Sequence, residues 1–180
     1  LVALPFIPPF NQQYMIRWLT TAGLIATAAI AFDFTTGFIN IVNFGFYAIL
    51  GLGGYTSALL ASNFGISPWI GIFMGALASG ILGFLTGLLT LRVRGIFAAV
   101  MAWFIGLALM GLATKLVWLT RGPLGLNVDR LFETPSNLPY YYLILIIMLA
   151  AYLVCKWVTR SSIGVAFKAI GQNMEAARTS

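Results

Sequence analysis

No charged side chain occurs in the 58 residues from Phe34 to Leu91. A soluble domain needs charged groups on its surface, and about a quarter of the residues in an ordinary domain are charged. A single membrane-spanning helix, in contrast, needs only about 20 apolar residues. The uncharged stretch therefore predicts a chain that crosses a bilayer more than once, with polar breaks where the chain reverses.

The composition of the whole chain agrees with a membrane protein. Of its 180 residues, 61% are hydrophobic and 8% are charged. The sequence contains no His and a single Cys, which leaves out the usual zinc-ligand sets and Cys/His nucleophile pairs. We therefore expect no metal site, no cofactor and no enzymatic activity. The net charge of +6 does not indicate nucleic-acid binding, because the Lys and Arg residues lie at the edges of apolar blocks.

Five apolar blocks predict five membrane-spanning helices, over 15–36, 44–62, 67–91, 95–119 and 140–158. Ser67 and Pro68 form a favourable helix start, with a capping residue followed by proline. The expected fold class is an all-α, polytopic transmembrane helical bundle in a single domain over 1–180. Many glycines lie in the blocks, and the pairs Gly71/Gly75 and Gly83/Gly87 have the GxxxG spacing that lets helix backbones approach closely.

The basic residues predict the orientation of these helices. They gather at 92–94 and at 156–178, after the third and fifth blocks. Because cytoplasmic loops of membrane proteins carry an excess of Lys and Arg, both regions are expected on the cytoplasmic side. The loop 120–139 and the N-terminal segment then lie outside, and 37–43 lies inside. The predicted location is the cytoplasmic membrane, crossed several times.

The segment 35–43 is the most polar part of the uncharged stretch. Asn40 and Asn43 are three residues apart and would share one helix face. Transporters place broken helices of this kind beside the path of their substrate. The alternative is a short cytoplasmic turn in which both asparagines are solvated. Asp33 is either a functional carboxylate within the membrane or a residue that reaches the lipid head groups.

The basic C-terminal tail, 160–180, predicts two short helices. Ser161 and Ser162 can cap the first helix, Gly171 interrupts it, and Asn173 can cap the second. Two short helices joined by glycine on the cytoplasmic face are typical of a docking segment. An amphipathic connector at the membrane surface remains the alternative.

Several segments, in one order along the chain, resemble the LivM-like permease of branched-chain amino acid ABC importers. The sequence GLGGYTSALL at 51–60 is similar to the family's GIGAYTAALL, and LRVRG at 91–95 to its LRxRG. The segment TRGPLGL at 120–126 takes the place of a TGGxxGL loop. The tail 162–177 resembles the family's coupling segment, SxxGRAxxAIxxNxxAA. The matches cover most of residues 20–178.

The resemblance implies roughly half of a type II ABC importer permease, which moves branched-chain amino acids inward. It implies three partners besides the lipid bilayer: cytoplasmic ATP-binding subunits, a second permease chain and an extracytoplasmic solute-binding protein. The sequence has no P-loop pattern, so we expect separate subunits to bind ATP. Relatives also carry urea and short amides, and a non-transporting scaffold subunit would use the same glycines. These alternatives stay open.

The resemblance and the residues together name two sets of candidate site residues. Those expected to contact the ATPase are Gly164, Lys168, Gly171, Glu175, Ala176 and Ala177. Those expected along the translocation pathway are Asn40, Asn43, Phe46 and Tyr55. Phe46 stands where the family often has His, and Val165 stands where Arg is usual. These departures bear on the solute more than on the class of transporter.

Overall fold

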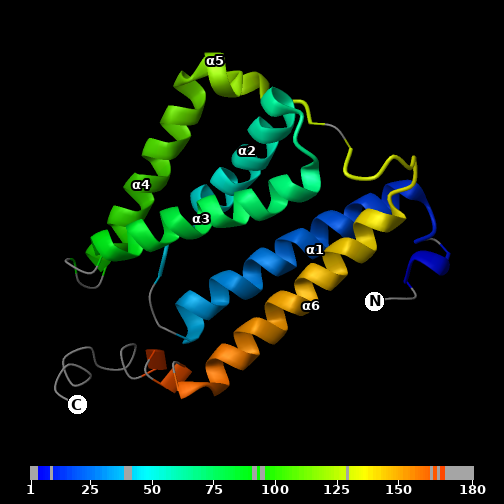
Figure 1. The fold of residues 1–180 in the computed structure, drawn as a ribbon. Coiled ribbons are helices and arrows are strands. Elements are labelled where there is room, and N and C mark those ends of the chain that lie inside the picture. The colour runs from blue at the N-terminus through cyan, green and yellow to red at the C-terminus, as the bar shows by residue number, and fades with distance from the viewer. Residues whose placement is uncertain are drawn as a thin grey trace. The chain divides into compact units, whose positions relative to one another are not determined.

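The structure is a computed structural model that describes residues 4–8, 10–38, 42–90, 93, 96–128, 130–162, 164–165 and 167–168. Within these residues every regular element is a helix, as predicted (Figure 1). The long helices are α1 (Gln13–Asp33), α2 (Phe46–Phe64), α3 (Pro68–Thr90), α4 (Ile96–Lys115) and α6 (Leu138–Arg160). The short elements are η1 (Leu4–Phe6), the π-helix η2 (Phe34–Phe38), α5 (Val117–Thr120) and η3 (Gly122–Leu124).

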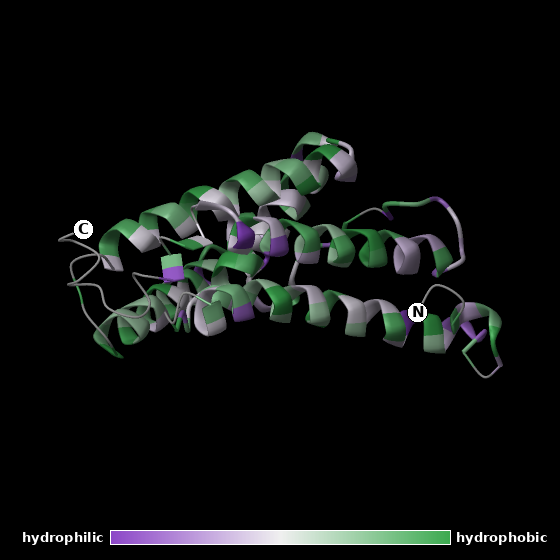
Figure 2. Ribbon diagram, turned by 90° about the horizontal axis from the view of Figure 1, so that it is seen from below, coloured by the Kyte–Doolittle hydropathy of each residue, from purple (hydrophilic) through white to green (hydrophobic). Residues whose placement is uncertain are grey.

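Four helical stretches of the described chain are long and apolar enough to cross a membrane: Gln13–Phe38, Pro68–Thr90, Ile96–Lys115 and Leu138–Arg160. They correspond to four of the five predicted spans, and α3 begins at Pro68 as expected. The remaining predicted span, 44–62, corresponds to α2, a helix of 19 residues that is not among these four stretches. Its three glycines and its hydroxyl-bearing side chains lower its hydropathy. Figure 2 shows that hydrophobic residues predominate along the long helices.

The chain divides into two compact units, one formed by 1–41 with 132–180 and the other by 42–131. We call them the outer-sequence unit and the central-sequence unit. A single membrane domain made of two groups of packed helices would also divide into two compact units. The prediction of a single permease domain therefore stays a prediction.

In the outer-sequence unit, α1 packs against α6, and the two helices run in the same direction. At their N-terminal ends, the backbone N–H of Asn137 donates to the Gln13 Oε1 atom at 2.9 Å. Large side chains fill the contact, since Ile16 is 1% exposed and Tyr141 2%. The predicted topology gives both helices this shared direction, from outside to inside.

In the central-sequence unit, α2 and α3 form a hairpin and α4 packs against both helices. The turn of the hairpin contains Gly65, whose φ of 61° is the left-handed conformation that glycine adopts without strain. The α4 residues Ala99 and Ala102 are buried. Short side chains therefore lie where these helices meet.

Candidate functional site

A local turn fixes the start of α2. The Gly45 N–H donates to the Asn43 Oδ1 atom at 3.0 Å, and the Phe46 N–H donates to the Asn43 carbonyl at 3.2 Å. This is an Asx-type turn, in which the side chain replaces a backbone acceptor. The Asn43 side-chain oxygen is therefore engaged in this turn. Asn40 lies outside the described residues.

Glycines along α2 and α3 set how the two helices align. A Cβ atom added at Gly53 would lie 3.1 Å from the carbonyl oxygen of Gly75, and one added at Gly71 would lie 3.3 Å from that of Ser57. The Ser79 hydroxyl donates to the Ile49 carbonyl at 2.8 Å. These contacts define one antiparallel register over the whole pair.

That register places Phe46, the first residue of α2, opposite Leu82. The residues 83–90 of α3 therefore extend about 12 Å beyond the start of α2, at 1.5 Å per residue. Likewise, Gly45 is buried against the carbonyl of Ala102, which lies six residues after α4 begins. If α3 and α4 cross the bilayer, α2 begins within it. Residues 42–45, which precede α2, would then lie at membrane depth, and a broken helix over 35–43 stays a prediction because residues 39–41 lie outside the described chain.

A pocket of about 540 Å³ lies between α2 and α3 next to this helix start. Phe46 is one of its lining residues, together with apolar and small residues of both helices. They are Ile49, Leu50, Gly53, Gly54, Ser57 and Ala58 from α2, Ile72, Gly75, Ala76 and Ser79 from α3, and Val128. The lining has no charged side chain, and its polar side chains are two serines. Such a lining suits an apolar group of a solute better than a charged group.

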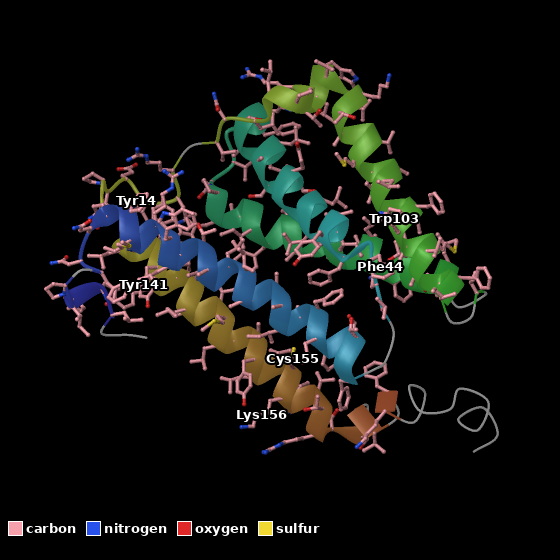
Figure 3. All side chains as sticks on the ribbon, turned by 180° about the vertical axis from the view of Figure 1, so that it is seen from behind. Tyr14, Phe44, Trp103, Tyr141, Cys155 and Lys156 are labelled. Carbon is pink, nitrogen blue, oxygen red and sulfur yellow. The ribbon has the colours of Figure 1, made fainter. Side chains whose placement is uncertain are left out.

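The pathway residues predicted from the sequence are therefore not all in one place. Phe46 lines the pocket, whereas Tyr55 lies on α2 but not in the lining. Sequence reasoning missed Ser57 and Ser79. A signal for Ser79 was present, because it continues the four-residue spacing of Gly71 and Gly75. Figure 3 shows Phe44, which precedes the turn at Gly45, and Trp103 of α4.

The helix α1 ends in a single π-helical turn, η2. In this turn the Thr35 hydroxyl donates to the Phe32 carbonyl at 2.8 Å. The Thr36 hydroxyl oxygen is buried and has no hydrogen-bond partner within the described chain. A Cβ atom at Gly37 would lie 2.6 Å from the Asp33 Oδ1 atom, so the Asp33 side chain folds over Gly37. π-helical turns inside α-helices are frequent at functional sites.

At the other end of the chain, Ser161 caps a short helix after α6, as predicted. Its hydroxyl accepts the Gly164 N–H at 3.4 Å and donates to the Val158 carbonyl at 2.7 Å. Gly164 is buried, and an added Cβ atom would meet the Val158 and Thr159 carbonyls. Glycine is therefore required by close packing against the end of α6.

Two further residues of the predicted coupling segment are described. The Phe167 ring packs edge-on against the Phe34 ring with centroids 6.4 Å apart, and Lys168 is exposed. The other predicted contact residues, Gly171, Glu175, Ala176 and Ala177, lie outside the described residues.

The loop that resembles TGGxxGL is built around Thr120. Its buried hydroxyl has the Ala113 and Leu116 carbonyls within reach as acceptors for its one hydrogen, and it accepts the Gly122 N–H. Arg121, at the position of the first family glycine, has a φ of 57°. Glycine adopts that left-handed conformation at little cost, whereas arginine is strained there.

Comparison with known proteins identifies a family for this chain. Residues 14–180 match the family described as "Branched-chain amino acid transport system / permease component". The chain belongs to this family. It is therefore an ABC-transporter permease chain, and permeases of this family are transporters rather than enzymes.

Two curated permeases are similar to this chain. The nucleoside ABC transporter permease protein NupC of Lactococcus lactis subsp. cremoris (strain MG1363) is 25% identical over 167 residues, which cover 78% of this chain and 50% of NupC. The high-affinity branched-chain amino acid transport system permease protein LivM of Salmonella typhimurium (strain LT2) is 36% identical over 83 residues, which cover 46% of this chain and 19% of LivM. This permease chain thus spans half or less of the curated relatives it matches. No solved structure matches it.

Proposed function

We propose that this permease chain moves branched-chain amino acids inward across the cytoplasmic membrane, as part of an importer driven by separate ATP-binding subunits. The start of α2 supports the proposal, because it lies beside a pocket with apolar lining and the predicted topology of α3 and α4 puts it within the bilayer. A helix that begins within the bilayer directs the positive end of its dipole into the protein. Such an end suits a carboxylate, and the apolar lining suits an aliphatic side chain.

The same reasoning supports the predicted partners. Membership of the permease family supports a second permease chain beside this one around the pathway. A solute-binding protein would deliver the solute from outside. The exposed Lys168 and the rest of 160–180 would bind the ATP-binding subunits on the cytoplasmic side.

Nucleosides form a second candidate class of solute, because NupC aligns with more of this chain than LivM does. A nucleoside carries no carboxylate, and its base and sugar need several hydrogen-bond partners. The described pocket offers only two serine side chains for this purpose. The pocket therefore favours an aliphatic amino acid over a nucleoside. Urea and short amides are further outcomes of the test.

Uptake into vesicles by the assembled transporter, with its binding protein and ATPase, distinguishes these solutes. We expect ATP-dependent uptake of leucine that excess isoleucine suppresses and that uridine and urea leave unchanged. Phe46→Ala should lower leucine uptake about tenfold, the usual effect of losing a well-packed aromatic contact with a ligand. Phe84→Ala is the matched control, since Phe84 lies on α3 and is 67% exposed. Uptake of uridine alone would assign the chain to the nucleoside class, and uptake of nothing would favour a scaffold.

The docking role of the tail has its own test. The double variant Lys168→Ala/Glu175→Ala should lower solute-stimulated ATP hydrolysis about tenfold while the permease still inserts, because each lost charged contact at a protein interface weakens the complex. Lys115→Ala, at the end of α4 that the topology places outside, should have no effect. Unchanged stimulation in the double variant would remove these two residues from the contact.

A further inference from the structure

Three phenylalanine rings form a row between the coupling segment and the π-helical turn. The Phe34 ring stacks on the Phe38 ring with centroids 5.7 Å apart and an angle of 21° between the planes. The Phe167 ring meets Phe34 from the other element at 6.4 Å and 84°, an edge-to-face contact. Both geometries are favourable arrangements for aromatic pairs. All three rings belong to the outer-sequence unit.

The position of Phe167 depends closely on the short helix after α6. Gly164 is buried against the Val158 and Thr159 carbonyls, and its N–H is bonded to the capping hydroxyl of Ser161. The Val165 N–H donates to the Ser161 carbonyl at 3.2 Å. Because this turn is tightly held, a displacement of the segment that carries Lys168 also displaces the Phe167 ring.

The element on the other side of the contact is suited to respond. A π-helical turn contains one more residue than an α-helical turn, and it is rare and usually confined to a single turn. In η2, moreover, the buried Thr36 hydroxyl has no partner within the described chain, which is unfavourable for this conformation. A change in the pitch of 34–38 could give that hydroxyl a carbonyl to bond with, as the hydroxyls of Thr20 and Thr27 do in α1.

We propose that Phe167 is a positioning residue that transmits movement of the coupling segment to the π-helical turn 34–38 through its contact with Phe34. The inference rests on the proposed docking of ATP-binding subunits on 160–180. It adds a specific mechanical path: the ATPase moves the short helix, Phe167 moves with it, and Phe34 changes the pitch of the turn at the end of α1.

The test compares Phe34→Leu, Phe167→Leu and the double variant in the assembled, reconstituted transporter. Each single variant should lower the ratio of solute-stimulated to basal ATP hydrolysis about two- to tenfold, the worth of one aromatic contact. The double variant should be no worse than Phe34→Leu alone, because Phe34→Leu already removes the contact with Phe167. Phe167→Tyr keeps the ring and should keep the ratio. Phe84→Leu on α3 is the control for the substitution itself.

A second measurement reports on the turn directly. In a Cys155→Ser background, Thr36→Cys should be alkylated at a rate that changes at least twofold when ATP is added to the complex. Phe167→Leu should abolish that change. Basal hydrolysis and the yield of complex serve as readouts of folding.

The outcomes separate this inference from the proposed function. If the unaltered chain does not associate with its ATPase, the proposed function fails and the inference fails with it. If the unaltered complex transports solute but Phe167→Leu leaves both the ratio and the ATP-dependent alkylation unchanged, only the inference is overturned. A parallel fall of basal and stimulated hydrolysis in Phe167→Leu that Phe167→Tyr does not rescue would reveal a purely structural contact, and it too would overturn the inference.

Discussion

The two long-helix pairs, α2 with α3 and α1 with α6, hold together through different kinds of contact. In the α2–α3 pair, backbone meets backbone at Gly53 and Gly75, and the Ser79 hydroxyl bonds to a carbonyl of the other helix. In the α1–α6 pair, large side chains such as Ile16 and Tyr141 fill the contact. Gln13 and Asn137 join that pair at one end.

The difference shows what each pair tolerates. Lipid is as apolar as a leucine side chain, so association within a bilayer depends on close packing and hydrogen bonds rather than on burial from water. A backbone contact has no rotamer that could move to admit an extra group, whereas a contact between side chains can partly repack. We therefore expect the α2–α3 pair to be sensitive to added volume and the α1–α6 pair to be sensitive to lost volume.

The largest effect is expected at Gly75, where an added Cβ atom would collide with the Gly53 carbonyl. Gly75→Leu should lower the unfolding free energy in mixed micelles by about 3 kcal/mol, because the helices must separate. Gly83→Leu is the matched control on the same helix, since no atom lies within 4 Å of its added Cβ position. The control should stay within about 0.5 kcal/mol of the unaltered chain. Equal losses in both variants would break the comparison.

A smaller effect is expected at Ile16, which is buried between α1 and α6. In soluble proteins Ile→Ala costs about 2–5 kcal/mol, but part of that cost is transfer from water, which a lipid-embedded pair does not pay. Ile16→Ala should therefore lower the unfolding free energy by about 1–2 kcal/mol, the share that belongs to the cavity. The same titration in mixed micelles measures it, with the exposed Ile25→Ala of α1 as control. A loss well inside the soluble range, about 3–5 kcal/mol, would show that burial from water contributes after all.

The smallest effect is expected at Ser79, whose hydroxyl donates to the Ile49 carbonyl. Ser79→Ala removes one hydrogen bond between helices, which in membrane proteins is worth about 0.6 kcal/mol on average. The loss should appear as a small shift in the denaturant midpoint, without a change in slope. A shift as large as that of Gly75→Leu would mean that the hydroxyl, rather than the backbone contact, holds the pair together.

Equal sequence patterns had unequal outcomes, which marks the limit of the sequence as a predictor here. Gly71/Gly75 and Gly83/Gly87 have the same GxxxG spacing on the same helix. The first pair lies against α2, while no atom lies within 4 Å of the added Cβ positions of the second. Spacing specifies which residues share a helix face, but not which part of that face another helix covers.

The candidate site shows the same limit. Asn43 could be selected from the sequence because it belongs to a polar interruption of an apolar stretch, and Phe46 because the resemblance places it where the family often has His. The lining of the pocket by Phe46 but not by Tyr55 depends on the register of α2 against α3. The contact of Phe167 with Phe34 could not be foreseen, since the two rings are 133 positions apart in the chain.

The sequence by itself determined the helical class, the membrane setting, four of the span positions, the cap at Ser161 and the family. These follow from properties of short continuous segments, because capping acts within one helical turn and hydropathy and flanking charge act within one span of about 20 residues. Only the tertiary structure decided that α2 begins about 12 Å inside the end of α3, which glycines carry backbone contacts and which ring meets the coupling segment. Those features depend on how far one helix slides along another, and that distance is set by packing between residues far apart in the chain.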